Sequence, residues 1–333
     1  MRITVLGAGY MGSAMAKVAA MRGHDVRLWG TWLDDPLLDV AERGEPHPRL
    51  KLPLSELTLL RAAQLPDALR GAELVVHAVN SDGAIPVAER AREHLPDVPI
   101  VSVTKGFLLA RSGKMERIDQ VVEETIGRPL RFVHAGGPAK AIEIARGVLT
   151  LMTFAAKNKG DAAIARDALG GGHLQVGVTD DLAGAEICSA LKNAYATGLG
   201  IFDGLIGKDA HNARAACFTQ AIVEMRLLAL AGGGREETVH GACGVGDLHV
   251  TAAGGRNRAF GERVGQGKQK AREVAAEMLA QGELTEGYPA IASAHRFARE
   301  HGVRELPLLS ALHAIVWEDA DVRATMCELT LSL

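Results

Sequence analysis

A glycine-rich loop lies directly after the first strand that the sequence predicts, and it constrains the fold more than any other feature. Gly7, Gly9 and Gly12 form the pattern GxGxxG between an apolar run at residues 3–6 and a helical segment at residues 10–22. In such a strand–loop–helix unit the first glycine permits a tight turn, the second lets a pyrophosphate approach, and the third lets helix and strand pack closely. The loop therefore predicts a Rossmann-type dinucleotide site; the alternative is a packing turn that binds nothing.

Short apolar runs alternate with helical segments up to about residue 180, which indicates βαβ units and a mainly parallel sheet. The expected strands are 3–6, 25–29, 74–79, 100–103, 131–134, 148–154 and 173–178. Beyond them only helices are expected, at 183–205, 212–231, 236–243, 259–266, 271–281, 288–300 and 307–317. The predicted fold class is α/β: a Rossmann-type domain over residues 1–180, followed by an all-helical domain over residues 181–333.

Composition excludes several classes of function. Among 333 residues, 37 Lys and Arg stand against 40 Asp and Glu, and only 4% are aromatic, so a nucleic-acid-binding protein is not expected. The four cysteines are widely spaced without a CxxC pair, which argues against a metal cluster or disulfide framework and favours a reducing cytoplasm. No run reaches 18 apolar residues and the N-terminus has no signal-peptide layout, so no membrane insertion is expected.

The choice between NAD and NADP depends on the end of the second strand. An NAD site usually places an acid there, about 20 residues after the glycine loop, on the ribose 2′-hydroxyl. Here the strand ends at Trp29 and continues with Gly30 and Thr31, and acids follow only at Asp34 and Asp35. This pattern slightly favours NADP.

Lys192 lies on a helix whose neighbouring positions carry no carboxylate, so it has no ion-pair partner on that helix. Such a lysine either extends to solvent or is desolvated with a lowered pKa. Farther along, Arg256 and Asn257 follow a glycine pair at a helix start, where charge and helix dipole together can hold an anion. The alternative for Arg256 and Asn257 is an ordinary helix start with solvated side chains.

Motifs from residue 7 to about residue 320 resemble those of the NAD(P)-dependent sn-glycerol-3-phosphate dehydrogenases, in that family's order. They are Gly7–Gly12, 102–106, Gly137-Pro138, 191–193, 209–213, 246–248, 256–258 and Glu286-Gly287. The resemblance implies hydride transfer between NAD(P) and the pair sn-glycerol 3-phosphate and dihydroxyacetone phosphate. It also implies a cofactor-binding N-terminal domain, a substrate-binding helical domain and a homodimer.

The resemblance assigns roles residue by residue. Lys192 matches the lysine that exchanges the proton, and Lys105 a lysine close to both nicotinamide and substrate. The substrate positions are Lys105, Gly137, Lys192, Asn193, Asp247, Thr251, Arg256 and Asn257, of which Arg256 and Asn257 would grip the phosphate. The cofactor positions are Gly7, Gly9, Tyr10, Met11, Gly12, Lys105, Ala141, Arg256 and Glu286. No metal is implied.

The chain departs from the family pattern at three places. Ala139 and Lys140 stand where Ser and Phe are common, and Gly255 replaces a frequent Ser beside Arg256. The segment between Asp247 and Arg256 is about two residues shorter than usual. Two other functions stay open: a related two-domain β-hydroxyacid-type dehydrogenase acting on a carboxylate, and a dinucleotide-sensing protein without turnover.

Overall fold

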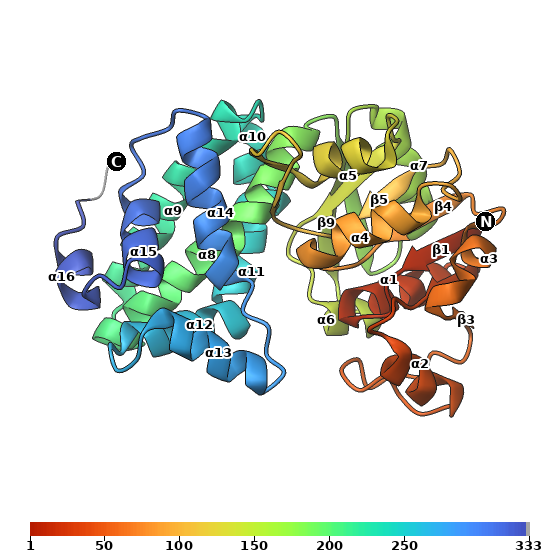
Figure 1. Cartoon of the computed structure of the whole chain (residues 1–333), viewed down its shortest axis with the longest axis horizontal. Coiled ribbons are helices and arrows are strands. Elements are labelled where there is room, and N and C mark those ends of the chain that lie inside the picture. The colour runs from red at the N-terminus through yellow and green to blue at the C-terminus, as the bar shows by residue number, and fades with distance from the viewer. Residues whose placement is uncertain (331–333) are drawn as a thin grey trace. The chain divides into compact units, whose positions relative to one another are not determined.

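Apolar strands of the N-terminal half assemble into one eight-stranded sheet in the computed structural model, which describes residues 1–330 (Figure 1). Across the sheet the order is β10 (Leu174–Thr179), β9 (Thr150–Ala156), β8 (Phe132–Gly136), β5 (Ile100–Ser102), β4 (Leu74–His77), β1 (Arg2–Leu6), β2 (Asp25–Trp29) and β3 (Thr58–Leu60). All neighbouring pairs are parallel except β8 with β9. The predicted mainly parallel sheet is confirmed.

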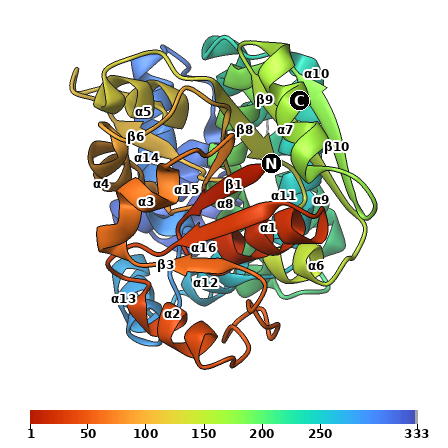
Figure 2. The ribbon, with the colours of Figure 1, turned by 90° about the vertical axis from the view of Figure 1, so that its right-hand side faces the viewer.

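Helices cover both faces of this sheet (Figure 2). The helices of this part are α1 (Tyr10–Met21), α2 (Asp35–Glu42), α3 (Leu65–Leu69), α4 (Ser81–Ala91), α5 (Ile118–Ile126), α6 (Ala141–Ala145) and α7 (Lys159–Leu169). Alternate residues of β4 serve the two faces, because Leu74 and Val76 pack with α1 and α7 whereas Val75 packs with α3 and α4. This double burial explains why the central strands are continuously apolar.

The chain divides into two compact units, and each unit is formed by two separate segments of the sequence. Met1–Lys105 and Ile118–Leu182 form the first unit, and the second combines Gly106–Arg117 with the chain from Ala183 onward. The inserted segment is a hairpin of β6 (Phe107–Leu109) and β7 (Met115–Arg117). Phe107 stacks on Phe297 at 4.2 Å between ring centroids, and the Met115 N–H donates to Glu300 over 2.7 Å.

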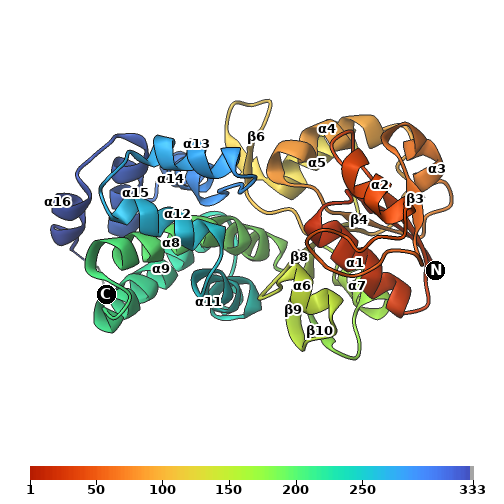
Figure 3. The same cartoon turned by 90° about the horizontal axis from the view of Figure 1, so that it is seen from below.

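The second unit is helical apart from that hairpin. Its helices are α8 (Leu182–Ile206), α9 (His211–Ala231), α10 (Glu236–His240), α11 (Asp247–Ala252), α12 (Arg256–Gly265), α13 (Ala271–Ala280), α14 (Gly287–Glu300), α15 (Pro307–Trp317) and α16 (Val322–Cys327). Helices α8 and α9 lie side by side (Figure 3). At the crossing of α8 and α12 the two backbones nearly touch: a Cβ on any of four glycines would lie 2.0–2.2 Å from a carbonyl oxygen of the other helix. These are Gly200, Gly204, Gly261 and Gly265.

Several predicted elements need correction. The strands at 58–60, 107–109 and 115–117 were not predicted, because three residues are too few for an alternation to show. The helix expected at 236–243 ends at His240, and residues 242–246 form a π-helical turn. That turn packs tightly, since a Cβ on Gly244 would lie 1.9 Å from the Val239 carbonyl oxygen. Helices α11 and α16 were also not predicted.

One buried carboxylate joins three helices of the second unit. Glu224 on α9 accepts hydrogen bonds from the Tyr195 hydroxyl on α8 (3.0 Å), from Gln220 (3.0 Å), and from the backbone N–H groups of Leu308 and Leu309 at the start of α15 (2.6 and 2.9 Å). Burial raises the pKa of Glu224, and the donors partly offset this effect. The carboxylate thereby satisfies N–H groups that a helix start leaves without partners.

Replacing Glu224 by glutamine should lower the free energy of unfolding by about 1–3 kcal/mol, because an amide NH₂ would then face groups that donate. Because the pKa of Glu224 is raised in the folded chain, its contribution to the free energy of unfolding depends on pH. That contribution is fully present below the pKa of the unfolded chain and decreases as the pH rises. The Gln variant should lack that slope. Urea unfolding at several pH values measures both effects, with the exposed Glu237→Gln as control. Equal stability of the two variants would contradict this role.

Candidate active site

The glycine loop has the geometry that a dinucleotide phosphate requires. Gly7 has a φ of +110°, and a Cβ there would lie 2.7 Å from the Ala78 carbonyl oxygen. A Cβ on Gly12 would lie 2.0 Å from the Gly7 carbonyl oxygen, so this glycine allows α1 to begin directly against the turn. A Cβ on Gly9 would meet nothing within 4 Å. Gly7 and Gly12 are therefore required by packing, whereas the space above Gly9 is open to a ligand.

The remaining sites predicted in the first unit follow the carboxyl ends of its strands, where ligands of doubly wound sheets bind. Tyr10 and Met11 pack against a small apolar cluster that includes Ala141, so the structure brings these three cofactor positions together. Gly137 follows β8 with a φ of +128°. Lys105 follows β5 and is partly buried.

A buried histidine outside the predicted site residues supports the segment before Lys105. The His77 ring nitrogen Nδ1 lies 3.2 Å from the Ser102 hydroxyl and 3.1 Å from the Thr104 hydroxyl, which donates to the Val79 carbonyl over 2.8 Å. Burial lowers the pKa of His77 to about 4, so the ring is neutral at physiological pH. We interpret these contacts as a rigid base for the loop that carries Lys105.

In the second unit, Lys192 forms a buried ion pair with Asp247. The Lys192 ammonium on α8 donates to the carboxylate of Asp247, the first residue of α11; Lys192 is 9% exposed and Asp247 is fully buried. No carboxylate lies three, four or seven residues from Lys192 along α8, but the fold supplies one from 55 residues away. Desolvation alone therefore does not describe the surroundings of Lys192, because a carboxylate lies beside its ammonium. Thr251 donates its hydroxyl to the Asp247 carbonyl over 2.7 Å.

Asn193 and Asn257 belong to one hydrogen-bonded chain. Asn257 Nδ2 donates to Asn193 Oδ1 (2.9 Å), Asn193 Nδ2 donates to Glu286 (3.0 Å), and the Gly287 N–H donates to Asn257 Oδ1 (2.9 Å). Three helices, α8, α12 and α14, are linked in this way. The structure thus assembles Asn193, Asn257 and Glu286, and it gives Asn257 a positioning role that the sequence did not indicate.

Arg256 and Arg258 differ in what they bind, although they stand two residues apart at the start of α12. Arg258 donates to buried Asp203 over 2.7 Å, and Asp203 also accepts from Arg214 Nε over 3.0 Å, which ties α12 to α8 and α9. Arg256 is partly buried and makes no hydrogen bond or ion pair with any residue from 1 to 330. Arg256 is therefore the cation at this helix start that is available to an anion.

Neither a group of metal ligands nor a membrane-spanning helix is found in the part of the chain that the structure describes. Among residues 1–330 no three His, Cys, Asp or Glu side chains are grouped as ligands of a metal ion would be. No helix in the same part of the chain has the length and hydrophobicity that a membrane crossing requires.

Comparison with known proteins gives a consistent result. Residues 2–162 match the family described as NAD-dependent glycerol-3-phosphate dehydrogenase N-terminus, and residues 181–327 match the corresponding C-terminus. The chain is 38% identical over 324 residues to the NAD(P)+ glycerol-3-phosphate dehydrogenase of Thiobacillus denitrificans, covering 96% of this chain and 94% of the relative. It is 32% identical over 333 residues to the NADP+-dependent glycerol-3-phosphate dehydrogenase of Archaeoglobus fulgidus, covering 99% of each.

Solved structures agree with these relatives. The glycerol-3-phosphate dehydrogenase of Coxiella burnetii superposes with a TM-score of 0.85 at 31% identity, covering 98% of each chain. A D-mandelate dehydrogenase bound to NADH and anilino(oxo)acetate reaches a TM-score of 0.59 at 15% identity, which is a likeness of fold alone.

The two loop glycines give a matched pair of variants. Gly12→Ala should destabilise the first unit, because its methyl group would overlap the Gly7 carbonyl. Gly9→Ala should leave thermal unfolding unchanged, since its methyl group meets open space, yet weaken dinucleotide binding by about tenfold or more where a pyrophosphate approaches the backbone. Thermal unfolding and calorimetric titration with NADH and NADPH measure the two effects. Undiminished affinity in Gly9→Ala would show that no phosphate lies over this residue.

Proposed function

We propose the function of this chain from one premise: it belongs to the NAD-dependent glycerol-3-phosphate dehydrogenase family. It interconverts sn-glycerol 3-phosphate and dihydroxyacetone phosphate with NAD or NADP as hydride carrier. The observation that carries the proposal is the combination, within one helical unit, of the buried Lys192–Asp247 pair and the available cation Arg256. This reaction requires two groups from the protein: one that transfers a proton and one that binds the substrate phosphate.

The glycine loop, Tyr10, Met11 and Ala141 would hold the nicotinamide dinucleotide, which accepts or gives the hydride when bound. Lys192 would exchange the proton of the C2 hydroxyl: as the neutral amine it accepts this proton during oxidation, and as the ammonium it donates it during reduction. Asp247 holds the Lys192 nitrogen in place and balances its charge when it is protonated. Lys105 would stabilise the oxyanion that develops at C2.

Arg256 would bind the phosphate of the substrate and so orient the reacting carbon. Asn257 is engaged with Asn193 and Gly287, so it contributes mainly by fixing the start of α12, with one N–H of its amide left for a ligand. Gly137 and Thr251 complete the proposed substrate contacts. Of the departures from the family pattern, Lys140 forms an exposed ion pair with Glu143 at 3.9 Å.

Two further proposals have different grounds: the family resemblance implies a homodimer, and the cysteine pattern favours the cytoplasm. The chain forms a homodimer, which a light-scattering mass near 35.2 kDa would contradict. The protein acts in the cytoplasm, in keeping with cysteines that are all free in the described structure.

The function is tested by following NADH and NADPH oxidation with three kinds of substrate. Dihydroxyacetone phosphate should be reduced, whereas unphosphorylated dihydroxyacetone and small 2-keto or 3-oxo acids should not. Arg256→Ala should lower kcat/KM for dihydroxyacetone phosphate mainly through KM, because it removes a charge-assisted contact of roughly 2–4 kcal/mol. Lys208→Ala, which alters an exposed lysine paired with Glu262, is the control. Turnover of keto acids alone would favour the carboxylate-acting alternative, and no turnover at all the sensing protein.

Lys192→Ala should reduce kcat by roughly 10²–10⁴, as expected when a general acid–base group is lost, with little change in cofactor affinity. Wild-type oxidation should slow as the pH falls, because it requires the neutral amine, and reduction should slow as the pH rises. Lys192→Arg keeps the charge but cannot deprotonate, so it should not restore oxidation. Near-normal turnover of the alanine variant with an unchanged pH profile would transfer the role to Lys105.

A further inference from the structure

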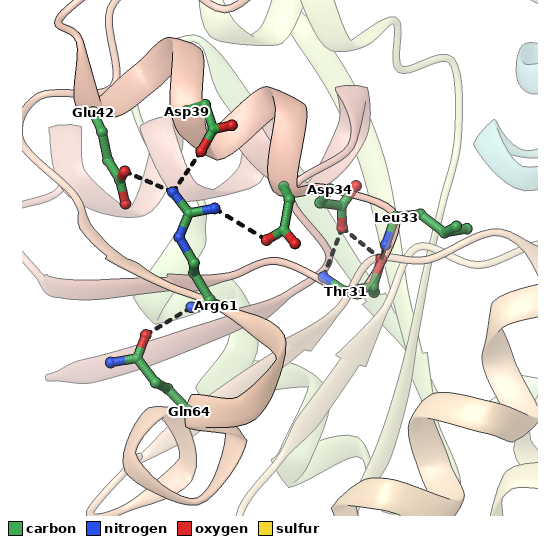
Figure 4. A network of polar contacts seen from close by, with 8 residues as sticks. Thr31, Leu33, Asp34, Asp39, Glu42, Arg61 and Gln64 are labelled. Carbon is green, nitrogen blue, oxygen red and sulfur yellow. Dashed lines mark hydrogen bonds and ion pairs between the residues drawn. The ribbon is translucent and has the colours of Figure 1, made fainter.

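The loop after β2 places one carboxylate against the glycine loop. Asp34 Oδ2 accepts hydrogen bonds from the Thr31 N–H (2.8 Å) and the Thr31 hydroxyl (2.8 Å) (Figure 4). It also accepts one from the Ala8 N–H over 3.2 Å. Ala8 lies within the GxGxxG segment itself. Although Asp34 follows the strand end at Trp29 by several residues, its side chain returns to the point where β2 meets the phosphate loop.

The local sequence explains this return. The Asp34 N–H donates to the Thr31 carbonyl over 3.0 Å, which closes a tight turn over residues 31–34. A Cβ on Gly30 would lie 2.7 Å from the side chain of buried Leu38 and 3.1 Å from the Asp34 Cβ. Gly30, the residue after the strand, therefore has no room for a side chain, because Leu38 and the Asp34 Cβ lie where that side chain would be.

A second network fixes α2, the helix that follows Asp34. Arg61, just after β3, pairs with Asp35 (3.1 Å), Asp39 (2.6 Å) and Glu42 (2.7 Å) along one face of α2 (Figure 4). Asp34 is not part of this ion-pair network and forms no ion pair with any residue from 1 to 330. Its charge is met by one hydroxyl and two peptide N–H groups, all at Oδ2, so Oδ1 is available to a ligand.

We propose that Asp34 determines the nucleotide specificity of this chain and favours NAD over NADP. The proposal rests on the proposed function, because it concerns the same cofactor site. A carboxylate at the end of the second strand of a Rossmann fold accepts a hydrogen bond from the adenosine ribose 2′-hydroxyl of NAD. The same carboxylate repels the 2′-phosphate of NADP, which carries negative charge at that position. The sequence favours NADP because Asp34 and Asp35 lie beyond the strand end, whereas the structure brings the Asp34 side chain back to Ala8.

Two arginines of the first unit, Arg90 and Arg49, could instead favour NADP by binding its 2′-phosphate. The Arg90 guanidinium lies over the indole ring of Trp32 at 4.1 Å, and Arg49 follows buried His47 in the segment between α2 and β3. If either bound a 2′-phosphate, NADP would be favoured in spite of Asp34. The experiment therefore measures the ratio of the two affinities, which a purely structural role of Asp34 would not change.

The test is calorimetric titration of the full-length protein with NAD+ and with NADP+, without substrate and at fixed ionic strength. Wild type should bind NAD+ more tightly. Asp34→Asn keeps an acceptor for the Ala8 and Thr31 donors but loses the charge, and it should shift the affinity ratio toward NADP+ by about tenfold. Asp35→Asn removes an equal charge one residue away and should shift the ratio less than about twofold. Asp34→Ser, which also lacks the charge, should reproduce the shift if the Asn variant folds poorly.

Three results would overturn the proposal: a wild type that prefers NADP+, a ratio unchanged in both Asp34 variants, or an equal loss of affinity for both nucleotides. The last result would mean that Asp34 only holds the loop. A shifted ratio in a protein that does not reduce dihydroxyacetone phosphate would support the role of Asp34 and contradict the proposed reaction, so the two failures are distinguishable.

Discussion

The contact between the backbones of α8 and α12 determines where the groups of the helical unit can stand. Side chains at the four glycine positions of this crossing would overlap carbonyl groups of the facing helix, so neither helix can slide or rotate freely. Lys192 and Asn193 lie on one of these helices, and Arg256 and Asn257 begin the other. A fixed crossing therefore fixes the separation of Lys192, which we propose to exchange the proton, and Arg256, which we propose to bind the phosphate; a substrate would have to match this separation.

Buried charges then define the register of the surrounding helices. Glu224 accepts from α8 and from the start of α15, Asp203 accepts from α9 and α12, and Asp247 pairs with Lys192. Each carboxylate is joined to another helix, so displacing one helix would leave a charge without its donors in the interior. Such a loss is costly, whereas the intact pair need not add much net stability. We interpret these groups as determinants of a single arrangement rather than as the source of stability.

Most of the fold could be predicted because its signals are local. The glycine loop lies within six residues, and each long strand or helix carries its own periodicity. The pairing of Lys192 with Asp247 could not be predicted, because a helix shows only neighbours three, four and seven residues away and Asp247 is 55 residues distant. Asp34 was visible in the sequence, but its return to Ala8 depends on a turn that the strand pattern does not reveal. The family resemblance identified positions, and the structure supplied their partners.

The two lysines singled out by the resemblance are positioned by different means. Lys192 is held by a carboxylate on a neighbouring helix. Lys105 is the last residue of the first unit before the hairpin, so its backbone is bonded on one side to β5 and its rigid His77 support and on the other to a hairpin fastened on α14 by Phe107 and Met115. The backbone of Lys105 is therefore located by the two segments that it joins, whereas the Lys192 nitrogen is located by the Asp247 carboxylate.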